Sequence, residues 1–427
     1  FYSINTNISG IKQDRLQKIV REAAKQCGRA RLPDICEPVN FDKAIEISRA
    51  AENRVLCYEN CRGKTIKDAV AKNSHTLALF VGAEGGFIRA DSTTSLWSVS
   101  SKAKHLETVA GGKPTVTFIA GNQSGMAYQM HTAAETTILY AQSYANGANV
   151  WYGLHGSASR FKDSPGSRAA TEFNRFVSSH RDVYASSRSA AKIALMWSQE
   201  TANNYSSSVE QSDFTDAKAA GYSHRGDHLV ELMSFFDILT RAHLQFDIID
   251  EVTLAEGIDQ YEWVILPDCA CLSDESARAL TQYVKKGGNL LSTFDTGFYH
   301  PDGSPAEMPK LAQIQGIQRA VETVKAEIPG MCYQMLGDSS FFDGLYGDLI
   351  PAPRLAVRCQ PLPKAEVLST ALEPMASCYA PLPQTGYPGI LRTKVGKGQS
   401  IYCSGAFGLA YSERAFPEFA RIITNMG

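Results

Sequence analysis

Short, uninterrupted apolar runs recur along this chain, and amphipathic stretches separate most of them. The clearest runs are residues 76–81, 115–120, 148–154, 192–197 and 263–267. Runs of this kind are typical of strands that are buried on both faces of a parallel sheet. The patterns between them predict helices, for example over residues 135–146 and 274–286. The alternation of the two patterns predicts an α/β fold.

The composition limits the partners that the protein can have. The chain has 427 residues, and its 42 Lys and Arg nearly balance its 44 Asp and Glu, for a net charge of -2. A chain-wide basic surface for nucleic acid is therefore excluded, while a local basic patch is left open. No apolar stretch reaches the roughly 18 residues of a membrane-spanning helix, so we expect no membrane partner. The 10 cysteines are scattered, which predicts reduced thiols and a cytoplasmic location.

The order of the patterns predicts four segments. Residues 1–91 and 92–188 each contain strand and helix patterns, and a polar stretch at residues 92–112 is expected to separate them. Residues 189–330 alternate strands and helices with short loops, as in an open, doubly wound sheet. In residues 331–427, proline-rich spacers separate short strands, which predicts a small β-rich domain.

A glycine-rich tract directly follows the first of the apolar runs. It reads Gly82-Ala83-Glu84-Gly85-Gly86. Glycines at such a place let the backbone approach a ligand closely and leave N–H groups free to bind it. The tract is neither GxGxxG nor a P-loop with Lys-Ser, so nucleoside triphosphate binding is not expected. A purely structural turn is the alternative to a ligand loop.

This tract belongs to a longer pattern. The upstream stretches 16–29 and 31–35 read LQKIVREAAKQCGR and RLPDI. Together with the glycine tract, they resemble the bacterial family of small-subunit ribosomal RNA uridine N3-methyltransferases. The resemblance implies a trefoil-knotted (SPOUT) α/β segment that binds S-adenosylmethionine, acts as a dimer and has ribosomal RNA as its partner. The residues that would bind the cofactor are Gly82, Glu84, Gly85 and Gly86.

The resemblance covers only about residues 1–90. The RNA-binding barrel of the family is absent, and residues 88–94 read IRADSTT, without the second cofactor loop that the family carries downstream. Because a knot needs both loops to close around the cofactor, the segment 1–91 is predicted to be truncated. Methyl transfer by this chain is therefore not expected.

The rest of the chain resembles a different family. Residues 268–275 and 283–296, which read DCACLSDE and YVKKGGNLLSTFDT, are similar to the trimerisation domain of β-galactosidase-type glycoside hydrolases. Residues 388–402 resemble the small β domain that follows it, and residues 135–152 resemble the last units of the catalytic (β/α)8 barrel. The resemblance implies a partial barrel, a glutamine-amidotransferase-like domain without its catalytic triad, a carbohydrate ligand, and a homo-oligomer that is a trimer or a dimer. It implies no cofactor.

Glycosidases of this kind need two carboxylates, which in a barrel stand at the carboxyl ends of strands. The run 115–120 leads into Gly121-Asn122-Gln123, so no Glu follows it where a nucleophile would be expected. The strand that would carry the acid/base residue is not recognisable upstream. The catalytic residues therefore stay unassigned, and the active site is predicted to be incomplete.

Four residues are candidates for contact with a sugar. Glu135 begins a predicted helix, while Trp151, Tyr152 and His155 lie at the end of the run 148–154. The last three could form a floor on which a sugar ring stacks, or they could pack a core and anchor a loop. For Glu135 the alternative is stabilisation of the helix dipole.

Other polar residues give weaker signals. His224 and His228, spaced i and i+4, could share a metal ion in a helix, but no third ligand is evident and no metal site is predicted. Cys269 and Cys271 follow a predicted strand without the elbow motif of an amidotransferase nucleophile. Asp295 lies in a loop with glycine and proline and is interpreted as a turn former.

These patterns predict a composite chain with its joint near residues 88–100. A natural fusion and a frameshifted or misassembled gene are both compatible with it. Three functions are open: a carbohydrate-active protein of glycoside hydrolase type, an S-adenosylmethionine-dependent RNA methyltransferase, and a non-catalytic assembly module.

Overall fold

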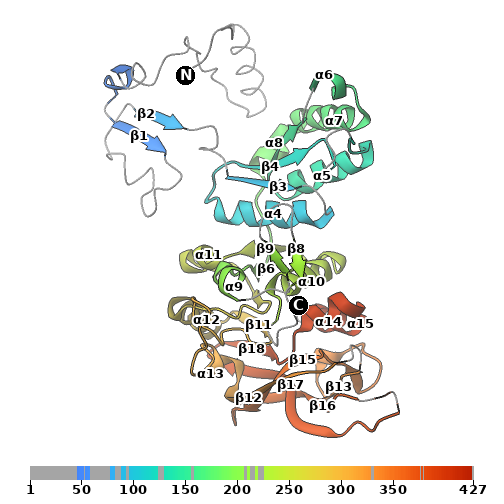
Figure 1. The fold of residues 1–427 in the computed structure, drawn as a ribbon. Coiled ribbons are helices and arrows are strands. Elements are labelled where there is room, and N and C mark those ends of the chain that lie inside the picture. The colour runs from blue at the N-terminus through green and yellow to red at the C-terminus, as the bar shows by residue number, and fades with distance from the viewer. Residues whose placement is uncertain are drawn as a thin grey trace. The chain divides into compact units, whose positions relative to one another are not determined.

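A computed structural model describes the protein in segments (Figure 1). The described residues are 46–51, 53–57, 77–81, 88–92, 96–123, 129–154, 158–205, 209–211, 217–219, 226–327, 331–375, 377 and 379–425. They form two compact units. The first extends to Val99 and includes Gly112–Ser187, and the second comprises Ser100–Gly111 and the residues from Arg188 onward.

Two parallel sheets contain the strands of the first unit. The smaller pairs β1 (Asn53–Cys57) with β2 (Leu77–Val81). The larger has three strands, in the order β3 (Ile88–Ser92), β4 (Thr115–Ala120) and β5 (Asn149–Gly153). The apolar runs in this part of the chain therefore form strands, as their pattern indicates.

Helices of the first unit follow the strands of the larger sheet. They are α5 (Ala133–Ala145), α6 (Ala158–Phe161), α7 (Pro165–Ser179) and α8 (Arg181–Ser186). The sequence predicts one helix over residues 168–186, but His180 leaves helical geometry, with φ -118 and ψ 29, and separates α7 from α8. The buried core between sheet and helices consists of Val99, Ile119, Leu139, Tyr140 and Ala170.

The polar stretch 92–112 forms a helix, α4 (Leu96–Val109), where the sequence predicts a boundary. Its buried side chains are Val99, Ala103 and Leu106, spaced i, i+4 and i+7. This apolar stripe is narrow and includes a small residue, so the surrounding Ser and Lys residues hide it in the sequence. The division between the two units falls inside this helix, after Val99.

The second unit is built on one 9-stranded mixed sheet. Its parallel half lies in the order β9 (Phe246–Ile249), β6 (Ile193–Met196), β10 (Trp263–Leu266), β11 (Asn289–Thr293) and β18 (Gly398–Cys403). Numbered along the chain, this order is 2-1-3-4-5, as in flavodoxin-like doubly wound sheets. It is the arrangement that the sequence predicts for residues 189–330, with β18 added from a distant part of the chain.

The other half of the sheet is antiparallel. It continues from β18 through β17 (Gln384–Val395), β16 (Glu366–Leu372), β13 (Tyr333–Leu336) and β14 (Leu349–Pro351). The expectation of a separate small β domain over residues 331–427 is therefore wrong. Because β18 pairs with β11 on one side and β17 on the other, the two halves share one sheet and one compact unit.

Helices cover both faces of the parallel strands. One face carries α10 (His228–Arg241), α14 (Phe407–Arg414) and α15 (Pro417–Thr424), and the opposite face carries α11 (Glu251–Glu256) and α12 (Asp274–Lys286) (Figure 1). Strand side chains alternate between these layers, since Leu195 belongs to the first core and Ala194 and Met196 belong to the second.

The remaining elements of the second unit are short or lie outside the large sheet. They are α9 (Gln199–Asn204), β7 (Val209–Gln211), β8 (Ala217–Ala219), α13 (Ala312–Gln315), β12 (Ile317–Lys325), the 3-10 helix η1 (Ser340–Phe342) and β15 (Leu355–Pro361). β12 and β15 form an antiparallel pair, as do β7 and β8. None of the helices that the structure describes has the length and apolar character needed to cross a membrane.

Candidate functional site

The candidate sugar residues of β5 point to opposite faces of the three-stranded sheet. Tyr152 packs toward the helices, with its ring 6.0 Å from that of Tyr140 in α5. Trp151 lies on the other face, 51% exposed, with its ring edge-to-face against Phe118 of the neighbouring strand at 5.4 Å. Successive strand residues alternate in this way, so the two side chains do not form one stacking surface.

Phe118 and Trp151 share the exposed face because they are register partners in the parallel pair β4–β5. The Phe118 ring lies over Gly153, where any Cβ would collide with it. A glycine at this place therefore lets the aromatic ring lie flat along the sheet. The result is an aromatic face of which Trp151 is the most exposed member that the structure describes.

Glu135 is engaged in capping helix α5. Its carboxylate accepts hydrogen bonds from the N–H of Thr132 at 2.8 Å and from the Thr132 hydroxyl at 3.0 Å, and the hydroxyl in turn accepts the Glu135 N–H. This reciprocal arrangement is a capping box. The hydrogen bond from the Thr132 N–H, followed by that from its hydroxyl, lowers the pKa of Glu135. The structure thus gives Glu135 the helix-stabilising role that was the alternative to sugar contact.

The remaining sequence candidates of the first unit lie outside the described residues. They are Gly82, Glu84, Gly85, Gly86 and His155. The strand β2 does end at Val81, immediately before the glycine tract. In the sequence, no Asp or Glu occurs in the four residues that follow β3, β4 or β5. Asp91 is the penultimate residue of β3, so the incompleteness of a glycosidase site stays a prediction.

In the second unit, the place where a doubly wound sheet usually binds a ligand is filled by its own side chains. That place is the carboxyl end of the sheet at the switch point, here between β6 and β10. Thr201 of α9 accepts the N–H of Cys271 at 3.1 Å, and Tyr205 packs on the same loop. Ser198 and Thr201 are fully buried. The crevice is closed by protein.

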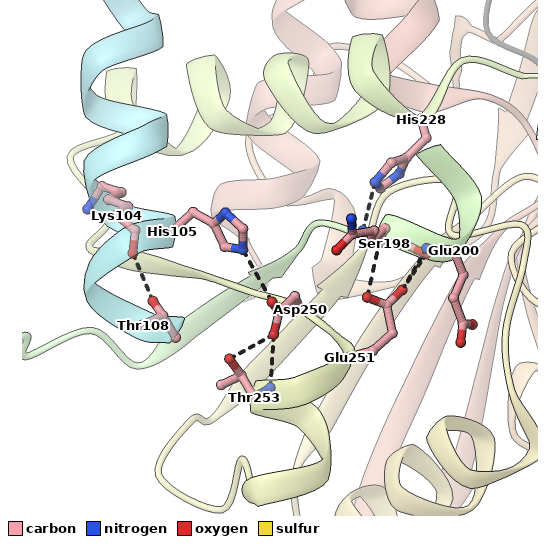
Figure 2. A network of polar contacts seen from close by, with 10 residues as sticks. Lys104, His105, Thr108, Ser198, Glu200, His228, Asp250, Glu251 and Thr253 are labelled. Atoms are coloured by element: carbon pink, nitrogen blue, oxygen red, sulfur yellow. Dashed lines mark hydrogen bonds and ion pairs between the residues drawn. The ribbon is translucent and has the colours of Figure 1, made fainter. Parts of the chain in front are cut away.

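Ser198, His228 and Glu251 meet at this end of the sheet, as Figure 2 shows. The Ser198 N–H donates to His228 Nε2 at 2.9 Å, and His228 Nδ1 lies 2.7 Å from the Pro267 carbonyl. A carbonyl can only accept, so Nδ1 carries the hydrogen. The Ser198 hydroxyl donates to Glu251 Oε1 at 2.7 Å and not to the histidine.

This hydrogen-bond pattern excludes a catalytic triad, in which the histidine accepts the hydrogen of the serine hydroxyl. Both ring nitrogens of His228 are engaged, so it cannot bind the metal ion that its spacing from His224 suggested, and His224 lies outside the described residues. Burial lowers the pKa of His228 and keeps it neutral. Among the described residues there is no cluster of three potential metal ligands.

The tight turns after β10 and β11 carry no nucleophilic side chain at their positive-φ positions. These positions are Asp268, with φ 49, and Phe294, with φ 50. Cys269 and Cys271 are fully buried, and burial raises the pKa of the Cys269 thiol well above its ordinary value. A thiol held in this state is not nucleophilic.

Two side chains hold the part of helix α4 that belongs to the second unit. Lys104 Nζ donates to the Phe246 carbonyl on β9 at 2.8 Å and lies over the Phe246 ring. His105 Nε2 lies 3.4 Å from Asp250 Oδ2, and its ring contacts Trp197 at 4.7 Å. Since β9 is an edge strand of the sheet, α4 covers an edge that would otherwise be open to other strands.

Sequence reasoning missed the most unusual polar group of the second unit. Asp268 and Asp295, which follow β10 and β11, are buried beside each other together with Glu231 of α10. The sequence interpretation of Asp295 as a simple turn former does not hold, because its carboxylate accepts the Tyr205 hydroxyl at 2.6 Å. The signal in the sequence that could have revealed this pair is an acidic residue shortly after each of two predicted strands.

These features describe a mixed α/β protein whose sheet domain is closed at its usual ligand site. Solved structures with a similar fold include β-galactosidases. The enzyme from Bacillus circulans sp. alkalophilus matches with 17% identity and a TM-score of 0.57, over 80% of this chain and 50% of that one. A cold-adapted β-galactosidase from a Rahnella species matches with 19% identity and a TM-score of 0.58, over the same shares.

Two family models match the sequence, in agreement with the two resemblances. Residues 3–95 match an RNA methyltransferase domain, and residues 191–336 match a β-galactosidase trimerisation domain. The composite resemblance is therefore confirmed. The chain spans about half the length of the two β-galactosidases, so these likenesses show the fold alone. No curated protein sequence matches the chain.

Proposed function

We propose that this protein is a glycosidase-derived, carbohydrate-binding component that assembles through its nine-stranded sheet unit and does not hydrolyse glycosides on its own. One observation carries the proposal. The match to the trimerisation domain falls on a sheet whose carboxyl end is filled by buried side chains of the same unit. A domain closed in this way is suited to assembly rather than to binding a substrate.

The proposed assembly is a homo-oligomer, a trimer or a dimer. Both edges of the large sheet are blocked, because Lys104 of α4 occupies a carbonyl of β9 and Pro351 ends β14. Subunits would therefore meet through helices and loops rather than by extension of the sheet. Light scattering coupled to size-exclusion chromatography tests this proposal, and a monomer at all concentrations would refute it.

The proposed carbohydrate site is the aromatic face of β4 and β5 around Trp151. An exposed indole can stack on the apolar face of a sugar ring. Titration with galactosides should quench the emission of Trp151, and Trp151→Ala should abolish binding. Phe176→Ala, which removes another exposed aromatic side chain of the same unit, is the matched control. Binding that survives Trp151→Ala would place the sugar elsewhere.

Absence of hydrolysis is the second part of the proposal. It is supported by the lack of carboxylates after β3, β4 and β5 in the sequence. Incubation of the purified chain with aryl β-galactosides should give no product above the uncatalysed rate. Turnover that persists after repurification would show that a complete site exists, and the proposal would fail.

The segments of the composite are assigned as part of the same proposal. Residues 1–91 would be a truncated knotted methyltransferase segment, 92–188 terminal barrel units, 189–330 the amidotransferase-like assembly domain and 331–427 its β-rich extension. The family-model match at residues 3–95 also favours one alternative function, binding of S-adenosylmethionine at Gly82–Gly86. Calorimetry with S-adenosylmethionine discriminates, since absence of heat would remove this alternative.

A further inference from the structure

Two strained turns bring Asp268 and Asp295 together at the carboxyl end of the sheet. Asp268 follows β10 with φ 49, and Phe294, just before Asp295, follows β11 with φ 50. Positive φ values are uncommon for residues other than glycine and mark turns that the surrounding structure enforces. Since β10 and β11 are neighbouring parallel strands, their ends face the same way and the two carboxyl groups meet.

Asp268 is fully buried, and neither of its carboxylate oxygens has a hydrogen-bond donor among the described residues. Its N–H donates to the Thr293 hydroxyl at 2.9 Å, so the backbone is held in place. A Cβ at Gly226 would collide with Asp268 Oδ2, which shows how closely the chain covers this side chain. An ionised carboxylate without donors or counter-charge is very costly at such a place.

Asp295 is also buried, and because it follows the strand next to that of Asp268, its carboxyl group lies close enough to act directly on that of Asp268. Asp295 Oδ2 accepts the Tyr205 hydroxyl at 2.6 Å, and the Tyr205 oxygen in turn accepts the Gly226 N–H at 2.8 Å. Ionised carboxylates can only accept hydrogen bonds. A contact between two of them therefore requires a proton on one.

Among the residues that the structure describes, the charged groups that act on Asp268 are all acidic. They are Asp295 after β11 and, from α10 and its cap, Glu231 and Asp227. Burial, and then the charge of Asp295, raise the pKa of Asp268 well above its ordinary value. Burial also raises the pKa of Glu231 to about 7. Nothing charged positively among these groups replaces the proton.

We propose that Asp268 and Asp295 hold one shared proton in the folded protein, and that this proton keeps the loops after β10 and β11 together. While it is present, the carboxyl end of the sheet stays closed over Tyr205. When it is lost, two adjacent buried charges repel each other and the loops separate. The sheet unit is therefore sensitive to alkali, independently of whether the protein binds sugar.

The direction of the pH effect follows from linkage. Above the ordinary pKa of an Asp, the unfolded chain releases this proton and the folded chain keeps it. The unfolding equilibrium constant should then rise about tenfold per pH unit for each proton kept. Asp268→Asn supplies an amide donor to Asp295 without a titrating proton, so this share of the pH dependence should disappear.

The experiment measures unfolding of the full chain by urea between about pH 5 and about pH 9. Asp259→Asn, which removes an exposed carboxylate paired with Lys286, is the matched control. Glu231 is unchanged in every protein in the comparison. In Asp268→Asn, the free energy of unfolding should fall less steeply with rising pH than in the unaltered protein, and this variant should be the more stable of the two near pH ~9. Asp259→Asn should show the same pH dependence as the unaltered protein. Equal slopes for Asp268→Asn and the unaltered protein would overturn the proposal.

A direct measurement covers the case in which Asp268→Asn does not fold. Infrared spectroscopy of the unaltered protein, with its aspartates labelled by a carbon isotope, separates Asp carboxyl bands from those of Glu231. A protonated Asp carboxyl band at neutral pH that changes frequency in Asp295→Asn supports the shared proton, because the proton then has a different partner. Absence of such a band in the unaltered protein would overturn the proposal.

Discussion

Replacing Thr293 with Val tests how far the acidic cluster depends on one hydroxyl group. Thr293 ends β11 and is fully buried. Its hydroxyl accepts the Asp268 N–H at 2.9 Å and donates to Glu231 Oε2 at 2.8 Å. Val has nearly the same shape and also suits a strand, so Thr293→Val removes these hydrogen bonds and leaves the packing almost unchanged.

The expected loss can be worked out from the groups left behind. A buried polar group without its partner costs about 1–3 kcal/mol. Thr293→Val leaves two such groups, the Asp268 N–H and one oxygen of Glu231, so the free energy of unfolding should fall by about 2–6 kcal/mol. Glu231 keeps the N–H of Leu409 at 2.8 Å, which favours the lower part of this range.

Urea unfolding gives the free energy, and hydrogen exchange at the amides of β10 and β11 reports on the sheet unit separately. Thr293→Ser keeps the hydroxyl and should cost about 1 kcal/mol or less for the lost methyl group. Thr281→Val is the matched control, because its hydroxyl bonds only the Ala277 carbonyl within α12. If Thr293→Val costs no more than Thr281→Val, the reasoning about this cluster is refuted.

Three further perturbations test other parts of the structure. Thr132→Ala breaks the capping box with Glu135 and should destabilise α5 by about 1 kcal/mol, seen as faster hydrogen exchange in that helix; unchanged exchange would contradict the capping role. Because burial raises the pKa of Glu231 to about 7, Glu231 makes stability fall as pH rises toward 7, and Glu231→Gln should make the total fall shallower; an unchanged pH profile would contradict it. Lys104→Met leaves the Phe246 carbonyl at the sheet edge without its donor and should lower the free energy of unfolding by about 1–2 kcal/mol. Hydrogen exchange in β9 should become faster. An effect confined to the first unit would show that another group protects this edge.

The local elements of this fold could be predicted where several signals agree. The helix over residues 274–286 is found with the same bounds as α12, because an apolar face, a Ser273 cap and Gly287 all indicate it. The strand 246–249 is likewise found as β9. In contrast, α4 is hidden by its polar composition, since the apolar residues that its described part buries are Val99, Ala103 and Leu106.

Pairings between distant parts of the chain could not be predicted from these patterns. The strand at residues 398–403 reads as part of a local β domain, yet it lies beside β11, more than a hundred residues earlier in the chain. The sequence of a short strand does not identify the strand that pairs with it, because side-chain alternation determines only which face of the sheet each residue occupies. The same limit hid the meeting of Asp268 with Asp295, which depends on the adjacency of β10 and β11.

The candidate site was only partly accessible to sequence reasoning. Glu135 was correctly given a helix-start role as its alternative, since capping is local chemistry. Trp151 and Tyr152 were grouped by adjacency, although neighbours on a strand diverge. The geometry of His228 required its hydrogen-bond partners to be known, and these come from Ser198 and Pro267.

The central position of β18 has a consequence for how this protein comes to be folded as it is synthesised. A nascent chain that has reached only residue 336 contains everything in the trimerisation-domain match, but it lacks the strand that joins the two halves of the sheet. Strand β11 then ends in an open edge until residues 398–403 emerge from the ribosome. A stalled or clipped polypeptide of that length should be a client for chaperones rather than an autonomous module.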